Sequence, residues 1–212
     1  MLTVTNVSKR YGAKLALDQV SFKVSRGEIV GFLGTNGAGK TTMMNIITGY
    51  ISATSGSVTV DGHDILEEPS EVKSRIGYLP EIPPIYPDFT VEENLNFCYD
   101  LKKVKLERRP HLDDICERVS IQHVRGRLAR NLSMGYKQRV GIALALMGDP
   151  PMLILDEPTV GLDPLQIVEI RNLIKTLADT RTVILSSHIL QEIQAVCSRI
   201  IVIHNGRLVA DD

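Results

Sequence analysis

Nine consecutive residues, GTNGAGKTT at positions 34–42, combine glycines, a lysine and hydroxyl groups at a spacing that suits a phosphate group. Gly34 and Gly39 stand five positions apart, and Lys40 and Thr41 follow directly. The glycines permit a tight turn whose N–H groups face inward and form an anion-binding concavity. Lys40 adds a positive charge for the outer phosphates, and the Thr41 hydroxyl is placed to ligate Mg²⁺. The candidate nucleotide-binding residues of this loop are Gly34, Thr35, Asn36, Gly37, Ala38, Gly39, Lys40, Thr41 and Thr42.

The residues on either side of this loop favour the same interpretation. Residues 28–33 form an apolar run typical of a strand, and residues 40–49 have helical periodicity. A strand, a glycine loop and a helix N-terminus together aim the helix dipole at a phosphate. A flexible glycine turn would explain the loop alone but not its flanks. The sequence therefore predicts a binding site for a nucleoside triphosphate.

Two acidic residues end another apolar run, at positions 151–157. A buried strand that opens into an active site at its end has this pattern. Neighbouring side chains on a strand point to opposite sides, so we expect Asp156 to hold Mg²⁺ with Thr41 and Glu157 to act as general base. A structural role for the two acids is the alternative, but an unpaired buried charge costs several kcal/mol.

His188 ends a third apolar run, at positions 182–187, and is expected at the same edge of the sheet. A lone histidine is more often a satisfied surface or core residue than a functional one. Its place after a buried strand favours a functional role here, in which the imidazole donates to the terminal phosphate and orients water.

The composition is ordinary for a globular protein and indicates which kinds of partner to expect. Hydrophobic residues make up 43% and charged residues 23% of the 212 residues, which suffices for one large domain with a core. The net charge of −1 gives no reason to expect nucleic acid as a partner. Three cysteines without a CxxC pair favour a reducing cytosol over a disulfide framework or a zinc site. No signal peptide or membrane-spanning run is recognisable, so a spanning part would belong to another chain.

Alternating and apolar segments predict two sheets. Three alternating segments, 2–7, 19–24 and 57–60, indicate a small antiparallel sheet near the N-terminus. The other expected strands are 28–33, 75–81, 151–157 and 182–188, followed by a hairpin of 200–204 and 207–209 around Asn205-Gly206. Together they indicate an α/β fold with a mainly parallel central sheet.

A helical segment is predicted between the two halves of this sheet. Thr90 and Glu93 have capping-box spacing, so a helix should begin there. The expected helices are 90–101, about 112–119, one after Ser133, 167–178 and 189–196. The basic residues at 102–109 are interpreted as a solvated helix face. We therefore predict one domain, 1–212, with a phosphate-binding core and antiparallel subdomain (1–81 and 149–212) and an inserted helical subdomain (82–148).

One further stretch, LSMGYKQR at 132–139, decides which family the sequence resembles. Ser133 precedes an amphipathic helix and can cap it or bind an anion. With the phosphate loop, the paired acids and His188, this stretch resembles the signature motif of the ABC-type ATPases, usually Leu-Ser-Gly-Gly-Gln. The resemblance covers almost the whole chain and implies a P-loop NTPase core. Within the family, the sequence looks like the branch of export-type, ABC-2-type and gliding-motility systems.

The resemblance also implies roles for single residues. Tyr11 looks like the aromatic residue that stacks on adenine, and Leu162 and Asp163 belong to a loop that crosses to a partner subunit. The residues expected in catalysis are Glu157, His188 and Glu81, and the expected metal ligands are Thr41, Glu81 and Asp156. The signature residues expected to act on the partner's nucleotide are Ser133, Met134, Gly135 and Tyr136.

Three residues depart from the usual family pattern. Glu81 replaces a glutamine and brings a negative charge toward the Mg²⁺ site. Met134 replaces a glycine and Tyr136 a glutamine of the signature, whereas Ser133 and Gly135 are retained. Tyr136 leaves open how the nucleotide sugar is contacted, and it does not affect the expected catalytic role.

The resemblance implies an ATPase that works as a head-to-tail dimer with ATP and Mg²⁺. ATP would lie between the phosphate loop of one subunit and the signature of the other. Hydrolysis would reopen the dimer and drive a separate transmembrane permease subunit, in the direction of export. The chain would then lie in the cytoplasm, on the inner face of the cell membrane, where the apolar loop 82–89 docks the permease. Packing of this loop on its own subdomain is the alternative.

Two other functions fit parts of the sequence. One is a soluble ABC ATPase that acts on DNA or ribosomes. Its DNA-repair type has a long coiled coil and its translation type has two cassettes, whereas here about 90 residues without sustained heptads separate the loop from the signature of one cassette. The other is a regulatory module that binds ATP without hydrolysing it. The presence of all four expected catalytic and binding residues argues against this function: Lys40, Asp156, Glu157 and His188.

Overall fold

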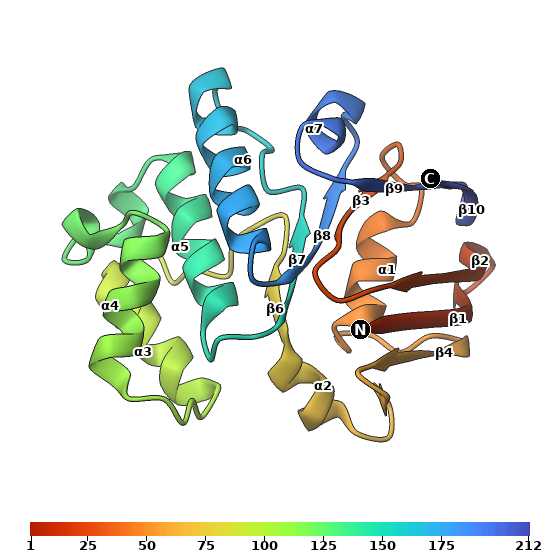
Figure 1. The fold of residues 1–212 in the computed structure, drawn as a ribbon, viewed down its shortest axis with the longest axis horizontal. Coiled ribbons are helices and arrows are strands. Elements are labelled where there is room, and N and C mark those ends of the chain that lie inside the picture. Colours follow the sequence, from red (N-terminus) through yellow and green to blue (C-terminus); the bar gives the residue numbers. More distant parts are fainter.

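The computed structural model describes residues 1–212 as two sheets with helices around them (Figure 1). The smaller sheet is antiparallel and has the strand order β2-β1-β4-β5. Its strands are β1 (Leu2–Tyr11), β2 (Lys14–Val24), β4 (Ser55–Val60) and β5 (His63–Asp64). β1 and β2 extend beyond the predicted segments, because register shifts between Val4 and Lys9 interrupt the alternation on which that prediction relied.

The larger sheet has the order β10-β9-β3-β8-β7-β6, and every neighbouring pair is parallel except β9 and β10. Its strands are β3 (Ile29–Leu33), β6 (Ile76–Leu79), β7 (Met152–Asp156), β8 (Thr182–Ser187), β9 (Arg199–His204) and β10 (Arg207–Asp211). The predicted mainly parallel central sheet is confirmed. Asn205 and Gly206 turn the last hairpin with positive φ angles of 48° and 76°, as a tight turn requires.

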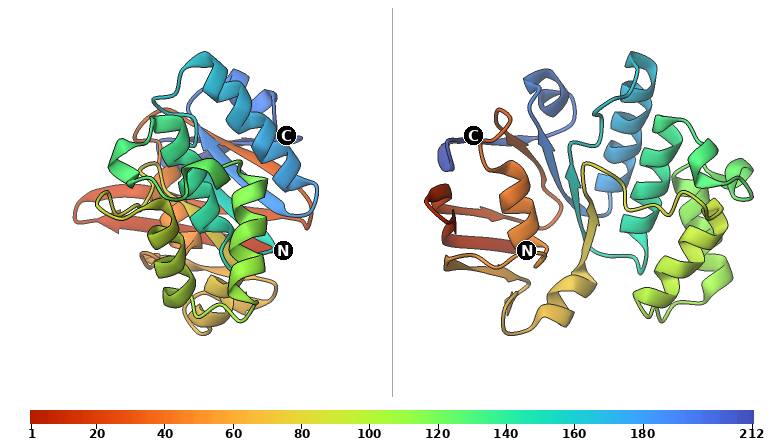
Figure 2. Two further views of the ribbon diagram at one scale, coloured as in Figure 1. Left: turned by 90° about the vertical axis from the view of Figure 1, so that its left-hand side faces the viewer. Right: turned by 180° about the vertical axis from the view of Figure 1, so that it is seen from behind.

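Helices cover both faces of the larger sheet. α1 (Lys40–Ile47) packs between the two sheets, whereas α5 (Met134–Leu146), α6 (Pro164–Ala178) and α7 (Leu190–Gln194) pack on the opposite face. α3 (Val91–Leu101) and α4 (Arg108–Arg118) lie against α5, at the end of the molecule farthest from the small sheet, as Figure 2 shows from behind. The remaining helices are α2 (Pro69–Arg75) and two 3₁₀ turns, η1 (Gln122–Val124) and η2 (Ala129–Asn131).

Some helix boundaries differ from the prediction. α2, which begins with a proline in its first turn, was not predicted because it is short and mostly polar. α4 begins at Arg108 rather than near residue 112. Arg108 pairs with Asp100, and its guanidinium lies 4.4 Å from the centroid of the Tyr99 ring, so this part of the basic stretch packs on α3. α6 begins at Pro164, and α7 ends at Gln194, two residues short of its predicted end.

The predicted capping box at the start of α3 is confirmed. The Glu93 N–H donates to Thr90 Oγ1 at 3.1 Å, and the Thr90 N–H donates to Glu93 Oε2 at 2.7 Å. These two bonds satisfy N–H groups that the helix itself leaves without partners.

The larger sheet is buried on both faces, by two separate groups of apolar side chains. On β7, Leu153 and Leu155 contribute to the group that contains α5 and α6, whereas Met152 and Ile154 contribute to the group around α1. All four side chains are completely buried. Polar side chains on this strand can therefore reach a ligand only at its end, which is where the candidate site lies.

Candidate active site

The glycine loop lies between β3 and α1, and close packing at two positions requires glycine. A Cβ on Gly39, whose φ is +111°, would lie 2.8 Å from Leu17 Cδ2 and 2.9 Å from the Ala16 carbonyl oxygen. A Cβ on Gly34 would lie 2.5 Å from the Ile203 carbonyl oxygen. The loop is therefore held against β2 and β9, with its backbone exposed to the site.

Lys40 is buried beside this loop, and three groups surround its ammonium. Its Nζ donates to the carbonyl oxygens of Gly34 at 2.7 Å and Thr35 at 3.4 Å, and it lies 3.2 Å from Glu157 Oε1. Only 6% of its side chain is exposed. The charge is thus fixed at the loop and already paired with an acid from the end of β7, where a phosphate would compete for it.

Asp156 is the last residue of β7 and is fully buried. Burial raises the pKa of its carboxyl group, while the Ser186 and Thr41 hydroxyls and the charge of Lys40 act in the opposite direction. Ser186 Oγ donates to Asp156 Oδ1, whereas Oδ2 has no hydrogen-bond partner. A buried carboxylate oxygen without a donor, next to a threonine hydroxyl, fits a hard cation such as Mg²⁺.

Glu157 lies just beyond β7 in the left-handed backbone region, with φ 51°. The strand alternation by which we separated the roles of the two acids therefore does not apply to it. Its N–H donates to Ser186 Oγ at 3.0 Å, and its side chain reaches both Lys40 and His188 Nδ1, which is 2.9 Å from Oε2. A non-glycine residue in this conformation is strained and persists only where the surroundings hold it.

One cavity of about 510 Å³ brings most of the predicted nucleotide-binding and catalytic residues together. Its lining residues are Tyr11, Lys14, Ala16, Asn36, Gly37, Gly39, Lys40, Thr41, Thr42, Glu81, Glu157, Val160 and His188. Tyr11 is half-exposed, and the Lys9 ammonium lies 5.2 Å from the centroid of its ring. Gly34, Thr35 and Asp156 do not line this cavity. The Gly34 and Thr35 carbonyls accept from Lys40, which does line it, and Asp156 is fully buried. Ala38 is buried, and its carbonyl accepts from the Gly206 N–H.

The signature residues lie in a different cavity, of about 400 Å³, that shares no lining residue with the first. Ser133, Gly135, Tyr136 and Asp163 line it. Ser133 and Asp163 also cap α5 and α6, because their side chains accept from the N–H groups of Tyr136 and Gln166. Met134 is exposed beside Gly161, and Leu162 is partly packed on the core.

Two residues that sequence reasoning missed hold the first cavity together. Ser186 links both acids, as described above. Glu192 on α7 accepts from the hydroxyls of Thr159, at 2.6 Å, and Ser187, at 3.1 Å, and so ties the segment after Glu157 to the end of β8. The polar pair Ser186-Ser187 directly before His188 was the available signal for the first of them.

Comparison with known proteins agrees with this geometry. The family model described as "ABC transporter" matches residues 17–160. The chain belongs to the ABC transporter ATP-binding family. It is 40% identical to the bacitracin transport ATP-binding protein BcrA of Bacillus licheniformis over 213 residues, which covers 100% of this chain and 69% of that protein. It is 35% identical to the lipopolysaccharide export system ATP-binding protein LptB of Haemophilus influenzae, covering 99% of this chain and 89% of that protein.

A solved structure extends the likeness to the whole fold and to the reaction. The ATP-binding cassette MJ0796, in a dimeric post-hydrolysis state bound to ADP and Pi, has a TM-score of 0.89 and is 28% identical, covering 100% of this chain and 98% of that chain. The ABC cassette is therefore an ATP-binding, ATP-hydrolysing domain. None of its helices is both long and apolar enough to cross a membrane.

Proposed function

We propose that this ABC cassette binds and hydrolyses MgATP between two copies arranged head to tail. The observation that carries this proposal is the separation of its two candidate anion sites. Lys40 and Glu157 line one cavity, and Ser133 lines another that shares no residue with it. Within one copy, Ser133 is not part of the cavity of its own phosphate loop. A second copy that presents its signature cavity to the first would complete the site.

The residues that line or border the first cavity have separate roles in binding ATP and Mg²⁺. The N–H groups of the glycine loop and Lys40 bind the phosphates, and Tyr11 stacks on adenine. Thr41, Asp156 and Glu81 would hold Mg²⁺, which would neutralise charge on the phosphates. The unpartnered Asp156 Oδ2 supports that assignment.

Glu157 acts as the general base. It accepts a proton from the water that attacks the terminal phosphorus, while the bond from that phosphorus to the bridging oxygen of ADP breaks. His188 is hydrogen-bonded to Glu157 and orients the carboxylate and the water. The Ser133 hydroxyl and the N-terminus of α5 would contact the terminal phosphate from the second copy.

A variant with Glu157→Gln tests this assignment. The amide keeps the size of the side chain but cannot take the proton, so ATP turnover should fall at least about a hundredfold while ATP binding persists. ATP should then hold two copies together, which size-exclusion chromatography with light scattering detects. Normal turnover in this variant would remove Glu157 from the role of base.

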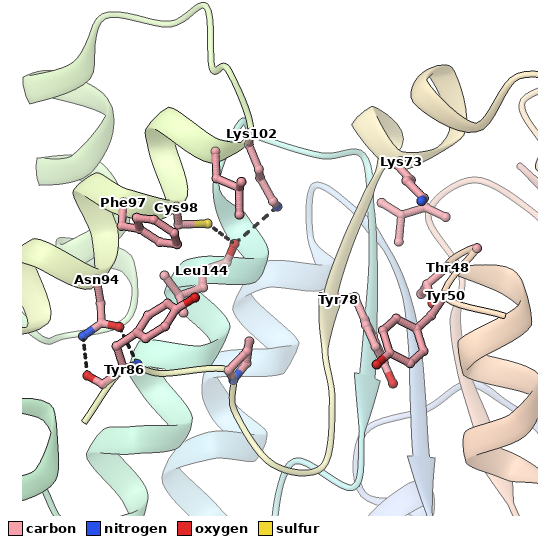
Figure 3. Close-up of a pocket in the computed structure, with 14 residues that line it drawn as sticks. Thr48, Tyr50, Lys73, Tyr78, Tyr86, Asn94, Phe97, Cys98, Lys102 and Leu144 are labelled. Atoms are coloured by element: carbon pink, nitrogen blue, oxygen red, sulfur yellow. Dashed lines mark hydrogen bonds between the residues drawn. The ribbon is translucent and has the colours of Figure 1, made fainter. Parts of the chain in front are cut away.

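A second surface is suited to bind a partner protein in the membrane. A cavity of about 530 Å³ lies between the central sheet and the helical segment, with Tyr50 and Tyr78 on one side and Phe97 and Leu144 on the other (Figure 3). The segment that borders it carries the exposed side chains of Ile82 and Tyr86. This apolar groove fits an amphipathic helix presented by a permease subunit, which would hold the chain at the inner face of the membrane.

Cysteine crosslinking tests this docking site. A Tyr86→Cys variant should crosslink to the permease in an assembled complex, whereas Ser74→Cys on α2, outside the cavity, should not. Failure of the Tyr86→Cys variant to crosslink would contradict docking at this groove.

The direction of transport is proposed as export. The chain's motifs resemble the export-type branch, and the related LptB is named for an export system. Action on DNA or ribosomes remains the alternative function. A permease that copurifies with the chain would exclude that alternative, and copurification with ribosomes or DNA would support it.

A further inference from the structure

Glu192 is a buried acid on α7 that is hydrogen-bonded to the two segments carrying Glu157 and His188. Its Oε2 accepts from Thr159 Oγ1 at 2.6 Å and from Ser187 Oγ at 3.1 Å. Both of these residues are buried as well, with 7% of Thr159 and 1% of Ser187 exposed. A carboxylate can only accept hydrogen bonds, so it directs the protons of both hydroxyls toward itself. The two segments are therefore joined through a single buried oxygen atom.

The bond to Ser187 fixes the backbone on either side of His188. Because the Ser187 proton points to Glu192, its oxygen is free to accept, and it accepts from the Ile189 N–H at 3.0 Å. Ser187 and Ile189 are the two chain neighbours of His188, so one hydroxyl holds the backbone before and after the imidazole. The His188 side chain is 39% exposed, and its Nδ1 lies 2.9 Å from Glu157 Oε2. Its position therefore depends strongly on its backbone.

The bond to Thr159 fixes the turn that follows Glu157. The Glu157 carbonyl accepts from the Val160 N–H at 3.2 Å, which closes a turn that contains Thr159. A hydrogen bond from this turn to α7 restrains the backbone of Glu157, whose φ of 51° is left-handed. A non-glycine residue keeps such a conformation only where its surroundings determine it.

The helix that carries Glu192 is itself fixed to the central sheet. α7 packs on β3 and β8 (Figure 1). Ile193, the next residue, is completely buried, and a Cβ on Gly31 of β3 would lie 2.2 Å from Ile193 Cγ2. Glycine at this position lets α7 lie close on the strand. The carboxylate of Glu192 is thus held in place by the sheet, and it holds both catalytic segments in turn.

We propose that Glu192 is a positioning residue for ATP hydrolysis, which sets the geometry of the hydrogen bond between His188 and Glu157. It acts through Ser187 and Thr159 and does not line the ATP cavity. This inference rests on the proposed roles of Glu157 and His188. Loss of Glu192 should lower the rate of the chemical step and leave the binding of ATP at the phosphate loop unchanged.

Steady-state ATPase kinetics of Glu192→Met and Thr159→Val test this inference. Both substitutions remove hydrogen-bonding atoms at similar side-chain size, so kcat should fall roughly ten- to fiftyfold, while KM for ATP should stay within about twofold. Glu192→Gln and Thr159→Ser keep the acceptor and the hydroxyl, and they should retain kcat within about threefold. Thr176→Val, on the exposed surface of α6, is the matched control and should leave kcat unchanged.

A double variant separates positioning from a role in stability alone. His188→Ala should by itself lower kcat at least about tenfold. If Glu192 acts by setting the hydrogen bond of His188, adding Glu192→Met to His188→Ala should lower kcat by less than about threefold further.

Three outcomes would count against these roles. An unchanged kcat in Glu192→Met, or the full ten- to fiftyfold further loss in the double variant, would overturn the positioning role of Glu192 while leaving the proposed function intact. An unchanged kcat in His188→Ala would instead remove the proposed role of His188, and the inference with it.

Discussion

At the scale of single residues, Ser186 is the group on which the geometry of both acids depends. Its hydroxyl donates to Asp156 Oδ1 and accepts from the Glu157 N–H at 3.0 Å, and the residue is fully buried. One side chain thus orients the proposed metal ligand and helps to hold Glu157 in its left-handed conformation.

Replacement of this hydroxyl, in Ser186→Ala, should lower kcat roughly ten- to a hundredfold, because two buried polar groups lose a partner at a cost of about 1–3 kcal/mol. KM for ATP should change little, since the glycine loop and Lys40 are untouched. Steady-state ATPase assays and thermal melts measure the two effects. Ser74→Ala, on the exposed surface of α2, is the matched control. Activity within about twofold of the unmodified chain would contradict the role of Ser186.

At the scale of elements, a glycine allows β6 and α5 to pack closely against each other. A Cβ on Gly77 would lie 2.1 Å from the carbonyl oxygen of Ala145, which belongs to the helix backbone and cannot rotate away. Glycine is therefore required on this strand for α5 to reach the sheet. α5 carries the signature residues at its other end, so this packing also fixes their position relative to the sheet.

The variant Gly77→Ala should lose about 1–3 kcal/mol in the free energy of unfolding, or fail to fold, because strand and helix must separate. Gly126→Ala is the control, since a Cβ there would meet no atom within 4 Å. Urea unfolding of both variants provides the measurement. Equal stability of the two variants would show that the strand and helix tolerate a wider spacing.

The C-terminal end of α5 depends on a histidine that must be neutral. His111 Nε2 accepts from the Gly148 N–H at 3.0 Å, which only an unprotonated nitrogen can do. Burial lowers the pKa of His111 from its ordinary value of 6.5, against the charges of Asp149 and Asp114. Lys102 Nζ donates to the carbonyls of Leu144 and Met147 at the same helix end, and burial likewise lowers its pKa.

The free energy of unfolding should therefore decrease as the pH is lowered, because His111 becomes protonated. Because its folded pKa lies below the unfolded value of 6.5, the contribution is complete above pH 6.5 and is lost as the pH falls through the folded pKa. Between about pH 7.5 and 5, the free energy of unfolding should drop more for the unmodified chain than for His111→Gln. His204→Gln, at the exposed end of β9, serves as control for the loss of a histidine. Parallel pH profiles for the unmodified chain and His111→Gln would contradict this account.

At the scale of the whole molecule, the two apolar groups meet at the central sheet, and each candidate cavity belongs to a different region. The first cavity joins the phosphate loop to the residues that follow β7 and β8, so a ligand there links the small sheet, α1 and the end of the central sheet. The second lies on α5 and α6, away from that junction. ATP bound in the first cavity should therefore stabilise the whole fold. This effect requires only one copy of the chain.

ATP at about a hundredfold its dissociation constant should stabilise the chain by roughly 2.7 kcal/mol and raise its melting temperature by about 5–10 °C. Lys40→Ala should lose this shift, since the phosphates lose their buried charge. Lys23→Ala, on β2 outside the cavity, should keep it. Differential scanning fluorimetry with and without ATP measures the shift, and an unaltered shift in Lys40→Ala would contradict the placement of the phosphates.

The sequence by itself determined the family, the mainly parallel sheet and the phosphate loop, because these depend on local patterns: glycine spacing, apolar runs and strand-end acids. Only the tertiary structure placed Ser186 and Glu192, whose partners lie on other elements and leave no local pattern. It also decided that Glu157 leaves the strand and that the signature has its own cavity. Those facts depend on how β7, β8 and α5 pack against one another, and such packing cannot be read from any one stretch of the chain.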